Sequence, residues 1–531
     1  MISDTPEEGT SSTAWWWYAL PVLVALVLRL NHIEGPEAFV DEGANILTSL
    51  DPRVREAFDP LAQGRPWLVH LFAPTKWLPA HALSVARVMS ALAGIVTMLL
   101  VGWTLHQLAG RRASMVGLWL WAVLPFAVFY ERFALQDPFI TTLLAGAVGL
   151  VTAASRAQRD RERALCCVAA GAAFGSAFLL KISAILALPW LGLLYLGLQF
   201  HSRRPVFAHG LLMVGIGAVV PVSSLGPALL KLGSHLDRYS ALPPLTGTGL
   251  LLSAGERLVV WLRYYFDFGG WPLVLLVGGG IFLCPRTRDG LAWICLLGWG
   301  TSLFVDSVFF NNTYGRYALP EHLPLIYFLG LAWGSTASGF RQIMTGATTV
   351  LALALVRWSI VSWQIGANPE QAPVSTSEID VYYQGMWSGS GLDRVRRFLS
   401  DYSTASNLPC MVITHQFHRP GCYGLMLMEL GDSRIAVLPQ TVHSREYLGA
   451  IAERIQMVAN GKAFTAFLLH EGRLHPVPPW FVEADSPVRL VFHTAHGAED
   501  HFTLWQLDLE RVLGRRPPPA ANSTAVGPRC E

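Results

Sequence analysis

Charged residues are scarce in this chain. Of its 531 residues, 37 are acidic and 39 are basic, so charged residues make up 14%, against about 25% in typical soluble proteins. Hydrophobic residues make up 52%, and the mean hydropathy is +0.39. The length alone would suggest several soluble domains, but this composition excludes them. It indicates that much of the chain lies in lipid.

The sequence also lacks a disulfide framework, an obvious metal site and an excess of either charge. Seven Cys residues contain no CxxC pair, and His70, His81 and His322 are not spaced like metal ligands. We therefore assign no metal and no cofactor, and leave a divalent metal open. A net charge of +2 excludes a dedicated nucleic-acid binder and a polybasic membrane-surface protein.

Long apolar runs are abundant, and runs of about 17–25 residues suit a membrane-spanning helix. The N-terminal 13 residues contain no Lys or Arg, so no cleavable signal peptide is expected. The runs predict a polytopic α-helical membrane protein with about eleven transmembrane helices. They lie at 14–32, 83–108, 113–131, 138–155, 164–181, 183–200, 207–230, 267–284, 290–309, 319–338 and 343–364.

Arginines collect in alternate loops, after the second, fourth, sixth, eighth and tenth predicted spans. Since positively charged loops stay in the cytoplasm, this alternation predicts a plasma (inner) membrane protein with a cytoplasmic N-terminus. The opposite loops and everything after residue 368 would lie outside. The eleven residues are Arg111, Arg112, Arg156, Arg159, Arg161, Arg163, Arg203, Arg204, Arg286, Arg288 and Arg341.

The C-terminal part of the sequence changes character. We expect residues 1–367 to form the transmembrane domain with a large first outer loop at 33–81, and 368–515 to form an extracytoplasmic α/β domain. Residues 516–531 are rich in Pro and Ser and are expected to be disordered. Within the α/β domain, Cys410 and Cys422 form either a disulfide or two free thiols.

Elements of the α/β domain follow from periodicity. Helices are expected at 388–402 and 444–459, and strands at 411–414, 463–469, 488–493 and 502–507.

Charged residues of both signs recur at the predicted outer boundary of the membrane, where they are costly unless they are solvated or used. Each has an ordinary explanation. Asp41 and Glu42 could be a solvated interfacial pair, Lys181 could extend to the interface, and Asp137 before Pro138 suits a helix start. Glu131 and Arg132 are expected to form an ion pair. Arg316, in a loop flanked by two tyrosines, is the hardest to explain structurally.

Several short motifs, in order, resemble the polyprenyl-phosphate-sugar-dependent glycosyltransferases of family 39. This GT-C class includes protein O-mannosyltransferases and the lipid A aminoarabinose transferase. The resemblance covers residues 15–335. Family members often have Ala after the DE pair and an aromatic residue two places further on, where this chain has Gly43 and Asn45. The motifs are LRL at 28–30, DE at 41–42, GRPWL at 64–68, ARVMSALAG at 86–94, YERFALQDPF at 130–139, FLLKISAILALP at 178–189 and GRYALPEHLPL at 315–325.

The resemblance implies inverting transfer of a sugar from a polyprenyl-phosphate donor to an acceptor hydroxyl outside the membrane. A hydroxyl needs a positioned base, and the departing lipid phosphate needs fixed cations. The acceptor is a lipid, a glycan or a protein, and membrane lipids surround the enzyme. The implied roles are base for Asp41, acceptor binding or tuning for Glu42, donor-phosphate binding for Arg65, Arg316 and Lys181, and sugar or acceptor binding for Asp137.

Two other functional classes remain open at this stage. A secondary transporter could use the same charges for ion coupling, although internal repeats and charges deep in broken helices would be expected. A non-catalytic envelope scaffold could bind a partner through the outer domain.

Overall fold

The computed structural model describes residues 16–530, with gaps at 36, 62, 203–206, 226–246, 285–289, 310–314, 335–340, 385–386, 415–418, 441, 443–444, 446, 461, 473–475, 484, 497–498 and 514–528. The chain forms two compact units. The helical unit comprises Met1–Ile33, Pro60–Trp67 and Arg87–Ser375, and the C-terminal unit comprises Glu34–Asp59, Leu68–Ala86 and Thr376–Glu531. Most of the predicted first outer loop is therefore grouped with the C-terminal residues.

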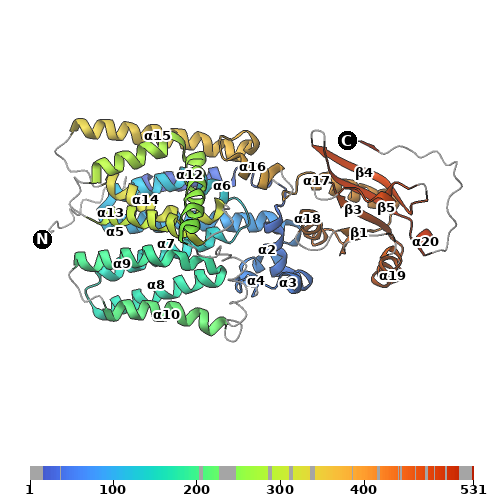
Figure 1. The fold of residues 1–531 in the computed structure, drawn as a ribbon, viewed down its shortest axis with the longest axis horizontal. Helices are drawn as coiled ribbons and strands as arrows, with labels where there is room; N and C mark the ends of the chain where they lie inside the picture. Colours follow the sequence, from blue (N-terminus) through green and yellow to red (C-terminus); the bar gives the residue numbers. More distant parts are fainter. Residues whose placement is uncertain are drawn as a thin grey trace. The chain divides into compact units, whose positions relative to one another are not determined.

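The helical unit consists of long apolar helices and short connecting turns, as Figure 1 shows. Every predicted span falls on one or more of these helices. Its helices are α1 (Trp16–Leu30), α5 (Ala82–Val123, whose first turn belongs to the C-terminal unit), α6 (Pro125–Tyr130), α7 (Asp137–Arg156), α8 (Asp160–Leu180), α9 (Leu188–Ser202), α10 (Phe207–Leu225), α12 (Gly247–Leu283), α13 (Leu291–Phe309), α14 (His322–Gly334) and α15 (Arg341–Ala367).

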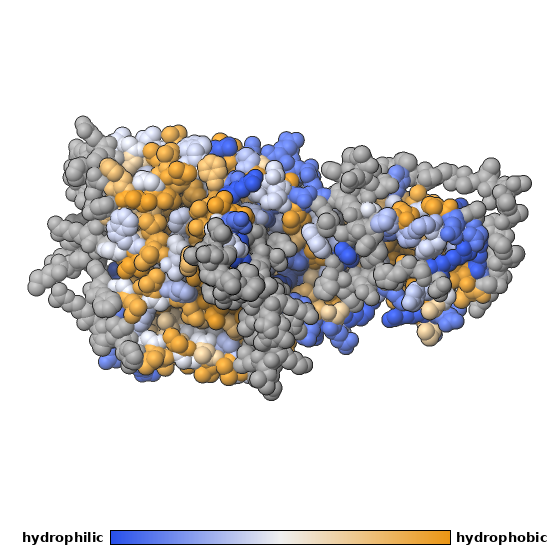
Figure 2. All heavy atoms as spheres, viewed as in Figure 1, coloured by the Kyte–Doolittle hydropathy of each residue, from blue (hydrophilic) through white to orange (hydrophobic). Residues whose placement is uncertain are grey.

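Seven helical segments of the described chain are long and apolar enough to cross a membrane, and three shorter apolar helices accompany them. Large apolar side chains such as Val259, Leu297 and Val356 are more than half exposed, and Figure 2 shows apolar residues gathered over the helices. Such a surface suits contact with lipid rather than water. The prediction of a polytopic α-helical membrane protein is confirmed, while the number of eleven crossings stays a prediction.

Two of the predicted spans lie within α5, on either side of a kink. The predicted break between 83–108 and 113–131 corresponds to non-helical backbone at Ala109 and Gly110, where Gly110 has a φ of +78°. Glycine adopts this conformation at little cost. The loops with Arg203–Arg204 and Arg286–Arg288 lie outside the described residues.

A buried ion pair joins the first helix to the turn after α6. The Arg29 guanidinium pairs with Glu131, and Trp121 Nε1 donates to the second oxygen of the same carboxylate at 3.2 Å. Arg132 instead donates to the carbonyls of Leu28 and His32. The expected Glu131–Arg132 pair is therefore wrong, because adjacent residues at a helix end point in different directions and distant partners are available.

The C-terminal unit contains a six-stranded sheet of order β2-β1-β3-β5-β4-β6. β2, β1 and β3 run parallel, whereas β5 is antiparallel to both β3 and β4. Its strands are β1 (Cys410–Thr414), β2 (Ile435–Pro439), β3 (Thr465–Glu471), β4 (Val488–His496), β5 (Glu499–Leu507) and β6 (Arg529–Cys530). Its helices are α2 (Val40–Leu50), α3 (Pro52–Phe58), α4 (Leu68–Leu71), α16 (Thr376–Ile379), α17 (Leu392–Ser406), α18 (Pro420–Glu429), α19 (Tyr447–Ala459) and α20 (Leu509–Val512).

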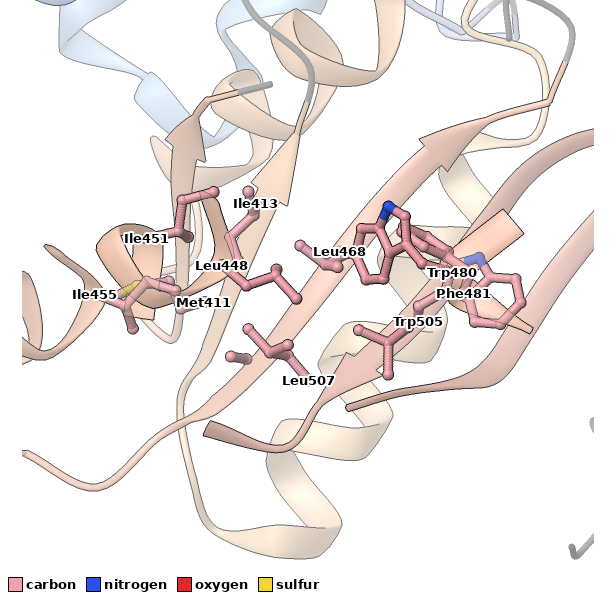
Figure 3. Close-up of a cluster of buried hydrophobic side chains, with 12 residues drawn as sticks. Met411, Ile413, Leu448, Ile451, Ile455, Leu468, Trp480, Phe481, Trp505 and Leu507 are labelled. Atoms are coloured by element: carbon pink, nitrogen blue, oxygen red, sulfur yellow. The ribbon is translucent and has the colours of Figure 1, made fainter. Parts of the chain in front are cut away.

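The expected α/β character of the C-terminal part is confirmed. α17, α19, β1, β3, β4 and β5 correspond to predicted elements, while α18 and β2 were not predicted. A cluster of buried apolar side chains joins one face of the sheet to α19 (Figure 3). Leu448, Ile451 and Ile455 of α19 pack there, in the spacing of a helix that buries one face.

Cys410 and Cys422 are both buried and free in the structure. Cys410 Sγ lies 3.6 Å from the carbonyl of Leu399, and Cys422 Sγ lies 3.8 Å from Met426 Sδ. Of the two alternatives left open by the sequence, the structure has the free thiols. The expected disordered tail lies outside the described residues, apart from Arg529 and Cys530.

Candidate functional site

The centre of the candidate site is a buried ion pair between two helix ends. Lys181 follows the last residue of α8 and Asp137 begins α7. Lys181 Nζ donates to Asp137 Oδ1 at 2.7 Å, and both side chains are at least nine-tenths buried. Asp137 also suits its position at a helix N-terminus, where a negative charge interacts favourably with the helix dipole. The structure thus brings together two predicted site residues that are 44 positions apart.

Arg65 is held beside this pair by the backbone. The amide of Trp67 donates to the carbonyl of Leu179 at 3.2 Å, and the amide of Ile182 donates to the carbonyl of Gly64 at 3.1 Å. These two bonds fix the segment around Arg65 on either side of Lys181. The Arg65 guanidinium and the Lys181 ammonium are close enough for their positive charges to repel each other.

Arg316 approaches the same lysine from a short 3₁₀ turn, η6 (Gly315–Ala318). The Lys181 ammonium lies 3.8 Å from the ring centre of Tyr317, and the Arg316 guanidinium lies 5.4 Å from the same centre. Both contacts are within the range of cation–π interactions. Arg316 is buried and also acts electrostatically on Lys181. Three predicted cations therefore form one cluster with Asp137 and Tyr317.

A small cavity of about 30 Å³ adjoins the cluster and is lined by three carboxyl groups, those of Asp137, Asp306 and Glu321. Ser302 and Tyr317 also line it. Asp306 lies within α13, is 2% exposed, and makes no hydrogen bond or ion pair with any other residue that the structure describes. Sequence reasoning missed Asp306 because it is a single acid in an otherwise apolar run. An ionisable residue inside a predicted span was the available signal.

Asp41 and Glu42 belong to the C-terminal unit, in the first turn of α2. Glu42 is fully buried, and its Oε2 accepts from the backbone N–H of Phe39 at 3.1 Å. This bond satisfies a donor that the helix start would otherwise leave without an intrahelical partner. Asp41 is half-buried. The structure thus gives Glu42 a local structural contact, and Asp41 is the less buried of the two residues.

The residues that depart from the family pattern lie on the same helix. A Cβ atom at Gly43 would lie 2.6 Å from the Cβ of Tyr423, so the close packing of α2 against α18 requires glycine there. Asn45 is buried. Among the described residues, no group of three or more His, Cys, Asp or Glu side chains is arranged to hold a metal ion.

The site residues lie on a fold that has known counterparts. Residues 66–225 match the family model described as dolichyl-phosphate-mannose-protein mannosyltransferase. Apo ArnT from Cupriavidus metallidurans aligns with a TM-score of 0.57 at 12% identity, over 96% of this chain and 100% of that one. The resemblance to the GT-C class is confirmed. In the comparison with curated protein sequences, none matches the chain.

A second structure of ArnT from Cupriavidus metallidurans, bound to undecaprenyl phosphate, aligns with a TM-score of 0.52 at 14% identity. It covers 92% of this chain and 98% of that one. The chain therefore has the fold of these membrane proteins over nearly its full length. The family-model match contains Asp137 and Lys181, whereas Asp41, Arg65 and Arg316 lie outside its bounds.

Proposed function

We propose that this protein is a membrane glycosyltransferase that moves a sugar from a polyprenyl-phosphate donor to an acceptor hydroxyl at the outer face of the membrane, with inversion. The cluster of buried Lys181 and Arg316 with half-buried Arg65 carries the proposal. Buried charges are costly, and inside membrane proteins they commonly mark a substrate path. The match to ArnT, which has been crystallised with undecaprenyl phosphate, supports a lipid phosphate as the ligand of these cations.

In this proposal the cations bind the donor phosphate and stabilise the charge that it gains as the leaving group. Lys181 has three N–H donors, and its bond to Asp137 uses one of them. In this proposal the other two N–H groups of Lys181 donate to phosphate oxygens. Asp137 then acts by positioning Lys181, and Arg65 and Arg316 supply forked donors that match a phosphate. We assign no metal and no cofactor to this reaction.

The base is assigned to Asp41. An acceptor hydroxyl is a weak nucleophile at neutral pH, and a carboxylate that removes its proton during attack raises the rate. Asp41 is the half-buried member of its pair, whereas Glu42 is fully buried and accepts from the Phe39 amide. Glu42 is therefore assigned to stabilising the start of α2 and to influencing the neighbouring base Asp41 through its charge.

Asp306 is assigned to the donor sugar. Asp306 lines the small cavity beside Asp137, which must widen to admit a sugar because its present volume suits only water. A carboxylate can accept hydrogen bonds from sugar hydroxyls. A secondary transporter and a non-catalytic scaffold are the competing functions. Neither a transporter nor a scaffold would consume a polyprenyl-phosphate sugar, so consumption of the donor distinguishes them from the proposed enzyme.

The test is sugar transfer by the purified full-length protein, supplied with radiolabelled polyprenyl-phosphate sugars and envelope fractions. The wild type should move label into an acceptor fraction. Arg316→Ala should weaken donor use about 10–150-fold, because a charge-assisted hydrogen bond contributes about 1.5–3 kcal/mol. Arg316→Lys should recover part of this loss, since the charge survives and the fork does not. Asp306→Asn should raise the KM for the donor in the same assay.

Arg454 is the matched control because it is an exposed arginine of α19. Arg454→Ala should transfer sugar like the wild type. Unchanged donor use by folded Arg316→Ala would make Arg316 a structural residue, and an inactive wild type with every donor would contradict the enzyme proposal.

A further inference from the structure

A second, much larger cavity lies wholly within the C-terminal unit. Its volume is about 920 Å³, within the range of about 300–1,000 Å³ that is common for ligand pockets. Its walls come from the segment before α2, the start of α5, the exposed face of α17 and the end of α18. None of the seven proposed site residues lines it.

The walls of this cavity are fixed to one another by hydrogen bonds. Both carboxylate oxygens of Glu37 accept from the first turn of α17, at 3.0 Å from the amide of Leu392 and 2.9 Å from that of Asp393. A Cβ atom at Gly389 would lie 2.6 Å from the carbonyl oxygen of Ala38. The segment before α2 therefore lies tightly against the start of α17, and the cavity is preformed.

The charged lining of the cavity contains four arginines and four acidic residues, and the acids are Glu34, Glu37, Asp393 and Asp432. α17 contributes Arg394, Arg396 and Arg397, and the turn before β2 contributes Arg434. Arg397 pairs with Asp393 at 3.0 Å, and Arg434 pairs with Asp432 at 3.2 Å.

The other two arginines have no such partner. Arg394 and Arg396 are exposed and form no close ion pair or hydrogen bond with the residues that the structure describes, and Arg396 acts on Asp432 only through longer-range electrostatics. The opposite face of α17 buries Val395 and Leu399, so packing does not need the two arginines.

This lining has the chemistry of a site for charged sugars. Guanidinium groups bind carboxylates and phosphates through paired N–H donors, while the carboxylates of Asp393 and Asp432 can accept from sugar hydroxyls. No Phe, Tyr or Trp side chain of the described chain lines the cavity. A purely apolar ligand would leave the guanidinium groups without hydrogen bonds as it displaced their water, which is costly.

We propose that this cavity binds an acidic glycan, a sugar chain with carboxylate or phosphate groups, with Arg394 and Arg396 as the residues that recognise its negative charge. The proposal rests on the proposed glycosyltransferase function in one respect only, namely that this glycan is part of the acceptor. Binding itself does not depend on that function.

The first experiment measures binding by calorimetry, with the full-length protein in nanodiscs of neutral phosphatidylcholine. Trigalacturonic acid is the acidic probe, and maltotriose is an uncharged probe of equal length. The wild type should bind the acidic probe at least tenfold more tightly. The double variant Arg394→Ser/Arg396→Ser should lose at least tenfold in affinity, and Arg454→Ser should bind like the wild type. Equal affinity for the two probes, or an unchanged double variant, would overturn the proposal.

Two further experiments are needed. The first distinguishes a glycan from a lipid head group as the source of negative charge, and the second distinguishes the cavity proposal from the proposed enzyme function. Nanodiscs that contain phosphatidylglycerol should leave probe binding unchanged; abolished binding would assign the cavity to lipid head groups and overturn the glycan. In the transfer assay, the double variant should raise the KM for the acceptor with the KM for the donor unchanged. An unchanged acceptor KM would refute the acceptor assignment. Probe binding by a wild type that transfers no sugar would contradict the proposed enzyme and leave the cavity assignment standing.

Discussion

Burial of Lys181 limits what its ammonium group can do. A lysine that only extends to the membrane interface keeps its charged end in water, whereas Lys181 is 6% exposed and its Nζ contacts Asp137 and Tyr317. The ordinary explanation from the sequence therefore does not describe this residue. Asp137 keeps its helix-start position and gains a second contact as the partner of Lys181. Asp137 can thus both stabilise the start of α7 and hold Lys181 in the proposed site.

Asp41 and Glu42 should respond differently to loss of charge. Asp41→Asn keeps the size of the side chain and removes its basic site, so transfer should fall about 10²–10⁴-fold while folding and donor binding persist. Glu42→Gln keeps an acceptor for the Phe39 amide and should cost less. Turnover with the labelled donor, alongside donor binding, measures both effects. Near-normal turnover by Asp41→Asn together with an inactive Glu42→Gln would move the base to Glu42.

Glu471 should make the stability of the C-terminal unit depend on pH. Burial raises the pKa of this carboxyl to about 7, and its Oε1 accepts from the backbone N–H of Gly421 at 2.9 Å. Because the folded state then binds a proton more tightly than the unfolded chain, the free energy of unfolding should fall as pH rises from about 4.5 to about 7, by up to about 3 kcal/mol. Glu37, whose pKa burial also raises to about 7, contributes in the same direction.

Glu471→Gln should therefore weaken this pH dependence and raise the thermal midpoint at pH 8, since an uncharged amide can still accept from Gly421. Thermal unfolding of the full-length protein at pH 5 and pH 8 measures the effect. Glu453→Gln, at an exposed position of α19, should keep the wild-type dependence. A Glu471→Gln protein with the wild-type slope would show that the carboxyl does not titrate in this interval.

At the scale of elements, the contact between α8 and α10 depends on small residues. A Cβ atom at Gly171 of α8 would lie 2.4 Å from the carbonyl oxygen of Met213 in α10. The side-by-side packing of these helices is visible in Figure 1. Small residues at such positions allow helices in membranes to approach closely.

Gly171→Ala should consequently force the two helices apart and destabilise the protein by about 1–3 kcal/mol. Gly215→Ala is the control on α10, because a Cβ atom there meets nothing within 4 Å; it should be neutral or slightly stabilising. Thermal midpoints of the two variants in detergent give the comparison. Equal midpoints would mean that α8 and α10 are less tightly packed than the structure has them.

Elements were predictable where one physical signal was strong. Apolar length located the membrane helices, and burial of one face located α17 and α19. α18 escaped because Gly421 and Gly424 near its start lower its helix propensity. Both glycines lie close to other side chains, Gly421 to Glu471 and Gly424 to Leu392. In the site, charge at the membrane boundary indicated Lys181 and Asp137 separately. Their pairing could not be predicted because it depends on two helix ends that are far apart in the sequence. Asp306 could be found only by searching the predicted apolar spans for ionisable residues.

At the scale of the whole molecule, the arrangement in the membrane follows from charge. Arg159 lies in the segment between α7 and α8 and is exposed, with 83% of its side chain accessible. Lys and Arg in short loops hold those loops on the cytoplasmic side. The segment after α15 is separated from this loop by an odd number of predicted crossings. The C-terminal unit should therefore lie on the opposite side from Arg159.

Single-cysteine labelling in intact cells tests this arrangement. In a background without the seven native cysteines, Arg159→Cys should resist a membrane-impermeant maleimide and react only after the membrane is opened. Glu453→Cys, at an exposed position of α19, should react in intact cells because its domain is predicted to lie outside. Reaction of both after opening shows that each thiol is accessible in the folded protein. Strong labelling at 159 in intact cells would reverse the topology, and with it the face on which the proposed acceptor meets the enzyme.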